Sequence, residues 1–177
     1  MLPYGAKDLA IAFRTVRKNT IQTANDIPEE KFDFSAAPGT RTVRQLLTHI
    51  AFADSLHTKV HGEQLTTFEG FDFQAFIGPL MAEEQEPRNK VEVIALLQKR
   101  GDTFATWLQT FSDEFLGERF AMPMGADPPS KTRFEMLMGV KEHEMHHRGQ
   151  LFLIQRMIGI VPHLTRQMQE RLVARSS

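Results

Sequence analysis

Apolar residues recur at three- and four-residue spacing in four long stretches of this sequence, and this period restricts what the chain can fold into. It places the apolar side chains on one face of an α-helix, whereas strands would alternate with period two, and we find no convincing case of that. Four such helices predict an all-α fold, a four-helix bundle, with residues 1–177 as one domain. The predicted helices cover about Tyr4–Asp26, Thr42–His61, Asn89–Phe111 and Thr132–Ile158.

The predicted helix ends carry their own signals. Pro28 stops the first helix, and Gly159 with Pro162 stops the fourth, because neither residue type continues a helix well. The segment His163–Ser177 then predicts a short polar final helix. Capping boxes open the last three bundle helices. These boxes are Thr42-x-x-Gln45, Asn89-x-x-Glu92 and Thr132-x-x-Glu135.

Two long connections join the second helix to the third and the third helix to the fourth. The first, Phe68–Pro87, is rich in phenylalanine, and the second is Asp113–Ser130. Long connections often form the mouth of a binding site. The alternative is that their aromatic side chains simply cap the core.

The composition narrows the classes of function. A net charge of -1 gives no basic surface for nucleic acid or anionic lipid, so we expect neither nucleic acid nor membrane as a partner. The N-terminal residues lack the apolar core of a signal peptide, and no stretch reaches the ~20 apolar residues of a membrane span, which favours a cytoplasmic protein. Cysteine is absent, so any metal ion must be held by histidine and carboxylate.

The strongest chemical signal is the pair His143 and His147 in the fourth predicted helix. Four residues apart, the two imidazoles lie on one face, about 40° from each other around the axis. That face is otherwise apolar, with Val140 and Leu151 among its members, and unpaired polar groups are costly to bury there. Two such imidazoles can chelate a divalent metal ion, and a third ligand with an open position would make a catalytic type of site.

The candidate third ligand is His49, which flanks an apolar stripe of the second predicted helix. The competing candidates are His57 and His61, an i, i+4 pair further along that helix, which we expect to be exposed or at the mouth of the site. Glu144 is the candidate catalytic residue for moving a proton, and His57, His61 and His146 are alternatives for that role.

The string from His143 to His147 also matches the H-E-x-x-H motif of zinc proteases, in which Glu144 would be the general base. The metzincin extension requires histidine where Leu153 stands, Glu170 is the one downstream glutamate for a gluzincin, and the strands of a protease are missing. A ferritin-like di-iron site needs two Glu-x-x-His motifs, and we find one. Both alternatives are therefore weaker than the three-histidine site.

Two sequence blocks resemble the DinB family of bacterial four-helix-bundle metalloproteins, and the resemblance extends over essentially the whole chain. It implies a three-histidine site at His49, His143 and His147 that commonly holds zinc or nickel, and it implies frequent homodimers. The matching blocks are TVRQLLTHIA at 42–51 and His143-x-x-His146-His147-Arg148-Gly149-Gln150-Leu151, followed by Arg156-x-x-Gly159-x-x-Pro162.

The resemblance also implies a function, since relatives of known chemistry include mycothiol-dependent maleylpyruvate isomerase and bacillithiol S-transferases. In these enzymes the nucleophile is a low-molecular-weight thiol bound to the metal ion. A chain without cysteine would need such a thiol as a cofactor. We therefore expect a metal-dependent transferase or isomerase with a thiol cofactor and a small-molecule substrate. Two alternatives stay open, namely a metal-dependent hydrolase and a non-catalytic metal-binding dimeric protein.

A second apolar stripe on the fourth predicted helix predicts a contact surface. Met138, Met145 and Phe152 recur every seven residues on the side opposite His147. A long central helix can also bury two faces within its own bundle, so the stripe by itself leaves both interpretations open. Together with the family resemblance it favours a symmetric homodimer.

Overall fold

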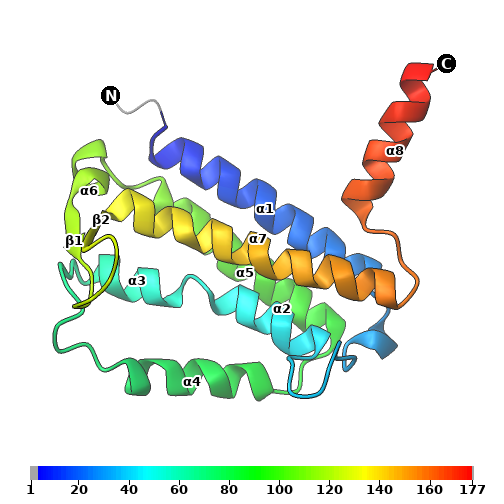
Figure 1. The fold of residues 1–177 in the computed structure, drawn as a ribbon, viewed down its shortest axis with the longest axis horizontal. Coiled ribbons are helices and arrows are strands. Elements are labelled where there is room, and N and C mark those ends of the chain that lie inside the picture. The colour runs from blue at the N-terminus through cyan, green and yellow to red at the C-terminus, as the bar shows by residue number, and fades with distance from the viewer. Residues whose placement is uncertain (1–3, 177) are drawn as a thin grey trace.

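Four rods of helix lie side by side along the molecule in the computed structural model, which describes residues 4–176 (Figure 1). The first and last rods run in one direction, and the two between them in chain order run in the other. The predicted all-α four-helix bundle is confirmed, and all three predicted capping boxes form. The rods are α1 (Ala6–Asp26), α2 (Val43–Phe52) continued by α3 (Ser55–Gly62), α5 (Lys90–Leu108) and α7 (Arg133–Met157).

The second predicted helix is not continuous, and the prediction of one helix over Thr42–His61 was wrong in this respect. The helix breaks between α2 and α3. There Arg100 of α5 supplies hydrogen-bond donors in place of the backbone N–H groups that a continuous helix would provide. The Arg100 Nε donates to the Ala51 carbonyl oxygen at 2.8 Å, and its Nη2 donates to Asp54 Oδ1 at 2.9 Å. The guanidinium also lies 4.3 Å from the centre of the Phe52 ring. A buried carbonyl released from a helix needs such a donor.

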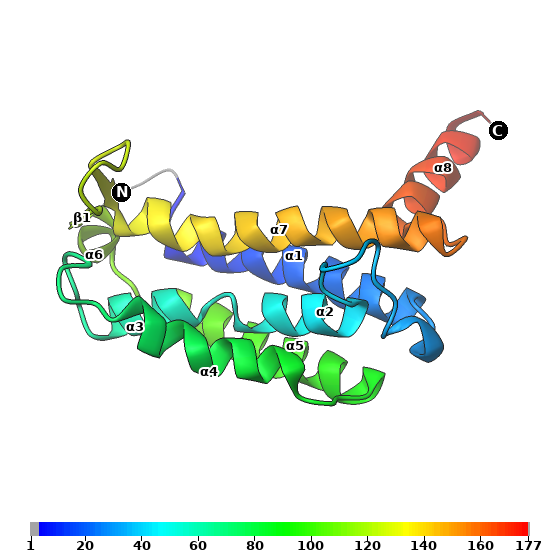
Figure 2. The same cartoon turned by 60° about the horizontal axis from the view of Figure 1, so that its bottom comes forward.

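Both predicted connections contain regular structure. The first holds α4 (Phe73–Gln85), which runs beside α2 and α3 on the outside of the bundle (Figure 2). The second holds α6 (Asp113–Gly117) and an antiparallel hairpin of β1 (Arg119–Ala121) and β2 (Ser130–Thr132). The sequence predicted no strands, because three residues are too few to show an alternation of period two. A short 3₁₀ turn, η1 (Glu29–Lys31), follows α1.

The predicted final helix is present as α8 (His163–Ser176). It starts against the bundle, where His163 Nε2 lies 3.3 Å from Asn19 Oδ1, and then projects away from the other helices (Figures 1 and 2). Within residues 4–176, no helix has the length and apolar character needed to cross a membrane.

A buried ion pair lies between two apolar clusters of the bundle core, one that includes Leu47 and Leu151 and one that includes Phe13 and Leu137. Arg17 of α1 donates from Nε to both carboxylate oxygens of Glu144 on α7, each at 3.0 Å, and Glu144 is fully buried. The same guanidinium donates to the carbonyl oxygen of Leu97 on α5 at 2.8 Å and of Ile50 on α2 at 3.3 Å. Gly101 leaves the room for this side chain, because a Cβ there would lie 2.8 Å from Arg17 Cγ. One guanidinium thus contacts three other rods of the bundle.

Removing the charge of Glu144 should destabilise the fold strongly. In Glu144→Gln the buried guanidinium of Arg17 loses its counter-charge, and breaking a buried pair in this way costs roughly 3–5 kcal/mol. Urea unfolding at neutral pH would measure the loss. The matched control is Glu142→Gln on the exposed side of the same helix, which should change stability by no more than about 0.5 kcal/mol. Equal stability of the two variants would contradict the importance of the pair.

Candidate metal centre

Three imidazoles from two helices meet between α2 and α7. His49 Nε2 and His147 Nε2 each lie 3.1 Å from His143 Nε2, and ligand atoms of all three residues lie within 4.8 Å of one another. Tetrahedral ligands at the usual zinc–nitrogen distance of 2.0–2.1 Å would be about 3.3 Å apart. The structure therefore brings together the three predicted ligands with a spacing that suits a divalent ion.

The outer ring nitrogens orient two of these imidazoles. His49 Nδ1 lies 2.7 Å from Glu84 Oε1, and His147 Nδ1 lies 2.9 Å from Gln150 Oε1. Since both partner atoms are acceptors, each Nδ1 carries the hydrogen and each Nε2 keeps its lone pair for a metal. His143 Nδ1 is buried and finds no partner among the residues that the structure describes.

Burial keeps His143 and His147 in the neutral form that binds metals. It lowers the pKa of His143 to about 4, with further lowering by the neighbouring His147 and His49. Burial also lowers the pKa of His147, although its hydrogen bond to Gln150 acts in the opposite direction. Neutral imidazole is the ligand form, so protons compete little with a metal ion at neutral pH.

Glu84 of α4 supports the cluster from outside, and sequence analysis missed it. Among the residues of α4, all of which the structure describes, it alone is buried. Burial by itself would raise its pKa, but hydrogen bonds from Arg41 and His49 outweigh that effect and leave the pKa below its ordinary value. Arg41 donates from Nε at 2.6 Å and from Nη2 at 3.2 Å. Neither residue stands in a recognisable motif, so no sequence signal identified them.

The other predicted site residues lie elsewhere. Glu144 is held by Arg17 in the core, which favours a structural role over proton transfer. His146 is exposed beside His147, and its Nε2 lies 3.2 Å from Gln150 Nε2.

His57 and His61 were predicted to be exposed or at the mouth of the site, and this was wrong for His61, which is buried, whereas His57 is partly buried. His61 is 2% exposed and accepts a hydrogen bond from Arg133 Nη1 at its Nδ1, 3.1 Å away, and the two histidine rings stack on each other. Burial lowers the pKa of His57 to about 4 and that of His61 to about 3. The structure does not bring them to the three-histidine cluster. Their position beside an apolar stripe in the sequence could not show that His61 would be buried.

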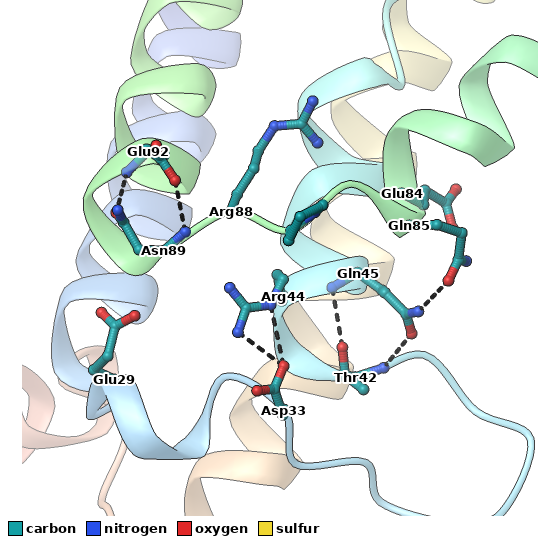
Figure 3. A pocket seen from close by; sticks show the side chains of 11 residues that line it. Glu29, Asp33, Thr42, Arg44, Gln45, Glu84, Gln85, Arg88, Asn89 and Glu92 are labelled. Carbon is teal, nitrogen blue, oxygen red and sulfur yellow. Dashed lines mark hydrogen bonds and ion pairs between the residues drawn. The ribbon is translucent and has the colours of Figure 1, made fainter.

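Two cavities flank the N-terminal end of α2. One, of about 640 Å³, is lined by His147, Arg41 and Glu84 and therefore opens beside the candidate metal centre. The other, of about 660 Å³, is shown in Figure 3. There Arg44 pairs with Asp33 at 2.8 Å, and the side chains of Thr42 and Gln45 are engaged in the capping box.

The fold and the histidine cluster place this protein among the helical bundles that carry a candidate metal centre on facing helices. Comparison with protein families identifies which family of such bundles it belongs to. The model of the DinB superfamily matches residues 12–151, and the chain belongs to the DinB superfamily, as its sequence predicted. No curated protein matches the chain.

Three solved structures share the fold. A DinB-like protein of Bacillus subtilis, YjoA, is 20% identical, with a TM-score of 0.62 over 85% of this chain and 91% of that one. YfiT from Bacillus subtilis, described as "a probable metal-dependent hydrolase with an unusual four-helix bundle topology", is 19% identical, with a TM-score of 0.66 over 90% and 91%. The colibactin self-resistance protein ClbS, solved with double-stranded DNA, is 16% identical, with a TM-score of 0.65 over 88% and 98%.

Replacing any one of the three clustered histidines should abolish the binding of a divalent metal ion. His49→Ala, His143→Ala and His147→Ala each leave two ligands, too few to hold a divalent ion firmly. Glu84→Gln removes the charge that orients His49 and should weaken metal affinity roughly 10–100-fold. Elemental analysis of protein dialysed against a weak chelator would measure occupancy. His163→Ala, at the start of α8, is the control that should keep full metal. Full metal in the His49 variant would contradict the ligand assignment.

Proposed function

We propose that the chain is a metal-dependent enzyme that transfers a low-molecular-weight thiol to a small-molecule substrate, or uses that thiol to isomerise it. His49, His143 and His147 hold the ion, zinc or nickel, and leave a position open to a ligand. A divalent ion on three neutral imidazoles supplies a positive charge that deprotonates a bound thiol without a separate base. The chain has no cysteine of its own to serve as the nucleophile.

The observation that supports a thiol rather than water as the nucleophile is that the two neighbouring carboxylates are already hydrogen bonded to other side chains. Hydrolysis at a metal ion commonly also uses a base near the ion to take a proton from the attacking water. Glu84 is held by Arg41 and His49, and Glu144 is held by Arg17 on the core side of α7. Both acceptors are thus committed to other hydrogen bonds, whereas a thiol needs neither of them.

A metal-dependent hydrolase is the second candidate, and His146 is the observation that favours it. This exposed imidazole lies beside His147, with 4.9 Å between the ring centres, and could accept a proton there. The similarity to YfiT points in the same direction. In this alternative His146 takes the proton that Glu144 was expected to take.

Turnover with matched substrates would separate these functions. Zinc- or nickel-loaded protein should consume monobromobimane with mycothiol or bacillithiol faster than the thiol alone, and chelation or His143→Ala should abolish the difference. His146→Ala should leave this rate within about twofold, because it removes no ligand and no required base. Hydrolysis of nitrophenyl esters without any thiol, lost in His146→Ala, would instead establish the hydrolase. A chain that unfolds on chelation and turns over neither substrate would have a structural metal.

We propose further that two copies associate through the outward side of α7. Met145 is 44% exposed there, whereas Met138 and Phe152 of the predicted stripe are partly buried in their own chain. The contact surface is therefore narrower than the sequence stripe, and Met145 lies at its centre. A symmetric pair would bury the same residues from both copies.

A charge at the centre of this surface should separate the copies. Met145→Glu should give a monomer that keeps its metal, because the histidines lie on another face of α7. Light scattering coupled to gel filtration would measure the mass, with the exposed Val91→Glu on α5 as the control that stays dimeric. A monomeric wild type at micromolar concentration would contradict the proposal.

We also propose a small molecule rather than nucleic acid as the ligand of this chain. The net charge of -1 gives no excess of basic side chains for a phosphate backbone. The DNA complex of ClbS concerns a protein of 16% identity, so the absence of nucleic acid here stays a prediction.

A further inference from the structure

The cavity beside the histidine cluster is lined by both apolar and charged residues. Leu46 and Ile154, each 4% exposed, give it an apolar side, and Leu153 forms an exposed rim. Arg41 and Glu84 also line it, and they are the two charged residues among its lining residues. A volume of about 640 Å³ suits a small organic ligand. A ligand that fills this cavity would therefore have one apolar part and one polar part.

Arg41 lines this cavity and has a hydrogen-bonding edge that Glu84 does not use. The carboxylate of Glu84 accepts hydrogen bonds along one side of the guanidinium, from Nε at 2.6 Å and from Nη2 at 3.2 Å. A guanidinium carries five N–H groups, so the end edge formed by Nη1 and the second hydrogen of Nη2 is left. No residue within 4–176 is found hydrogen bonded to Nη1, and the Arg41 side chain is 41% exposed. That end edge matches the spacing of two carboxylate oxygens.

The charges of the cavity favour an anion at that edge. Glu84 balances Arg41 and is itself turned toward His49 and Arg41. A divalent ion on three neutral imidazoles would then leave the cavity doubly positive. Arg44, three residues further on, is not equivalent, because its guanidinium pairs with Asp33 in the other cavity (Figure 3).

We propose that Arg41 binds the carboxylate of the substrate end-on, and that the substrate class is a small carboxylic acid with an apolar body. The apolar body lies along Leu46 and Ile154, and the ion at the three histidines faces the part that reacts. Arg41 is thus a specificity-determining residue, held ready by Glu84, which at the same time orients His49. The assignment of the substrate rests on the proposed function, whereas the anion site itself rests on the geometry of Arg41.

Binding of a matched pair of probes tests the site without turnover. Isothermal titration of the zinc-loaded full chain with phenylacetate and with neutral phenylacetamide should show about tenfold or greater preference for the anion. Arg41→Gln should abolish this preference and leave the affinity for phenylacetamide within about twofold. Arg41→Lys should keep part of it, because charge remains while the bidentate edge is lost. Arg44→Gln is the matched control and should bind like the wild type.

Zinc content, measured in every variant, separates the possible failures. An Arg41→Gln protein with full zinc and an undiminished preference for phenylacetate would overturn the proposal, since the ion alone would then bind the anion. Equal affinity of the wild type for both probes, or no binding of either at millimolar concentrations, would overturn it as well. An Arg41-dependent preference in a protein that turns over no thiol would sustain the anion site and reject the proposed transferase.

Discussion

The guanidinium of Arg17 ties together the helices on which the histidine cluster depends. From α1 it bonds the carboxylate of Glu144 on α7 and the carbonyl oxygen of Ile50 on α2. These residues directly follow His143 and His49 in the sequence. One buried side chain therefore sets the separation of the two helices at the level where their imidazoles meet. The desolvation of such a charge is costly, and its many hydrogen bonds are what make its burial tolerable.

The same arrangement places Glu144 of the H-E-x-x-H string away from the role that the glutamate has in zinc proteases. The spacing of His143 and His147 brings both imidazoles to one face of α7, as in those enzymes. Glu144 leaves that face for the core, where Arg17 binds both of its oxygens. The motif in the sequence shows which residues share a helix. It does not show that the carboxylate of Glu144 pairs with Arg17, because Arg17 belongs to another helix.

Much of the fold could be predicted from the sequence because its signals are local. The capping boxes at Thr42, Asn89 and Thr132 and the i, i+4 histidines need no information beyond one turn of helix. The break after α2 could not be predicted, since it depends on Arg100, which comes from a different helix. Glu84 was missed for a similar reason. Its role exists because α4 folds back beside α2, and nothing in its own neighbourhood distinguishes it from the glutamates around it.

Gly101 has a consequence for how sequences of this family can diverge. A methyl group at this position would overlap the stem of Arg17, whose far end is already held by three bundle helices and has no freedom to move aside. A larger residue at 101 is therefore compatible only with a shorter residue at 17. A shorter residue at 17 would in turn leave Glu144 buried without a counter-charge. Residues at positions 17, 101 and 144 are therefore expected to change together, or to stay unchanged together, among relatives.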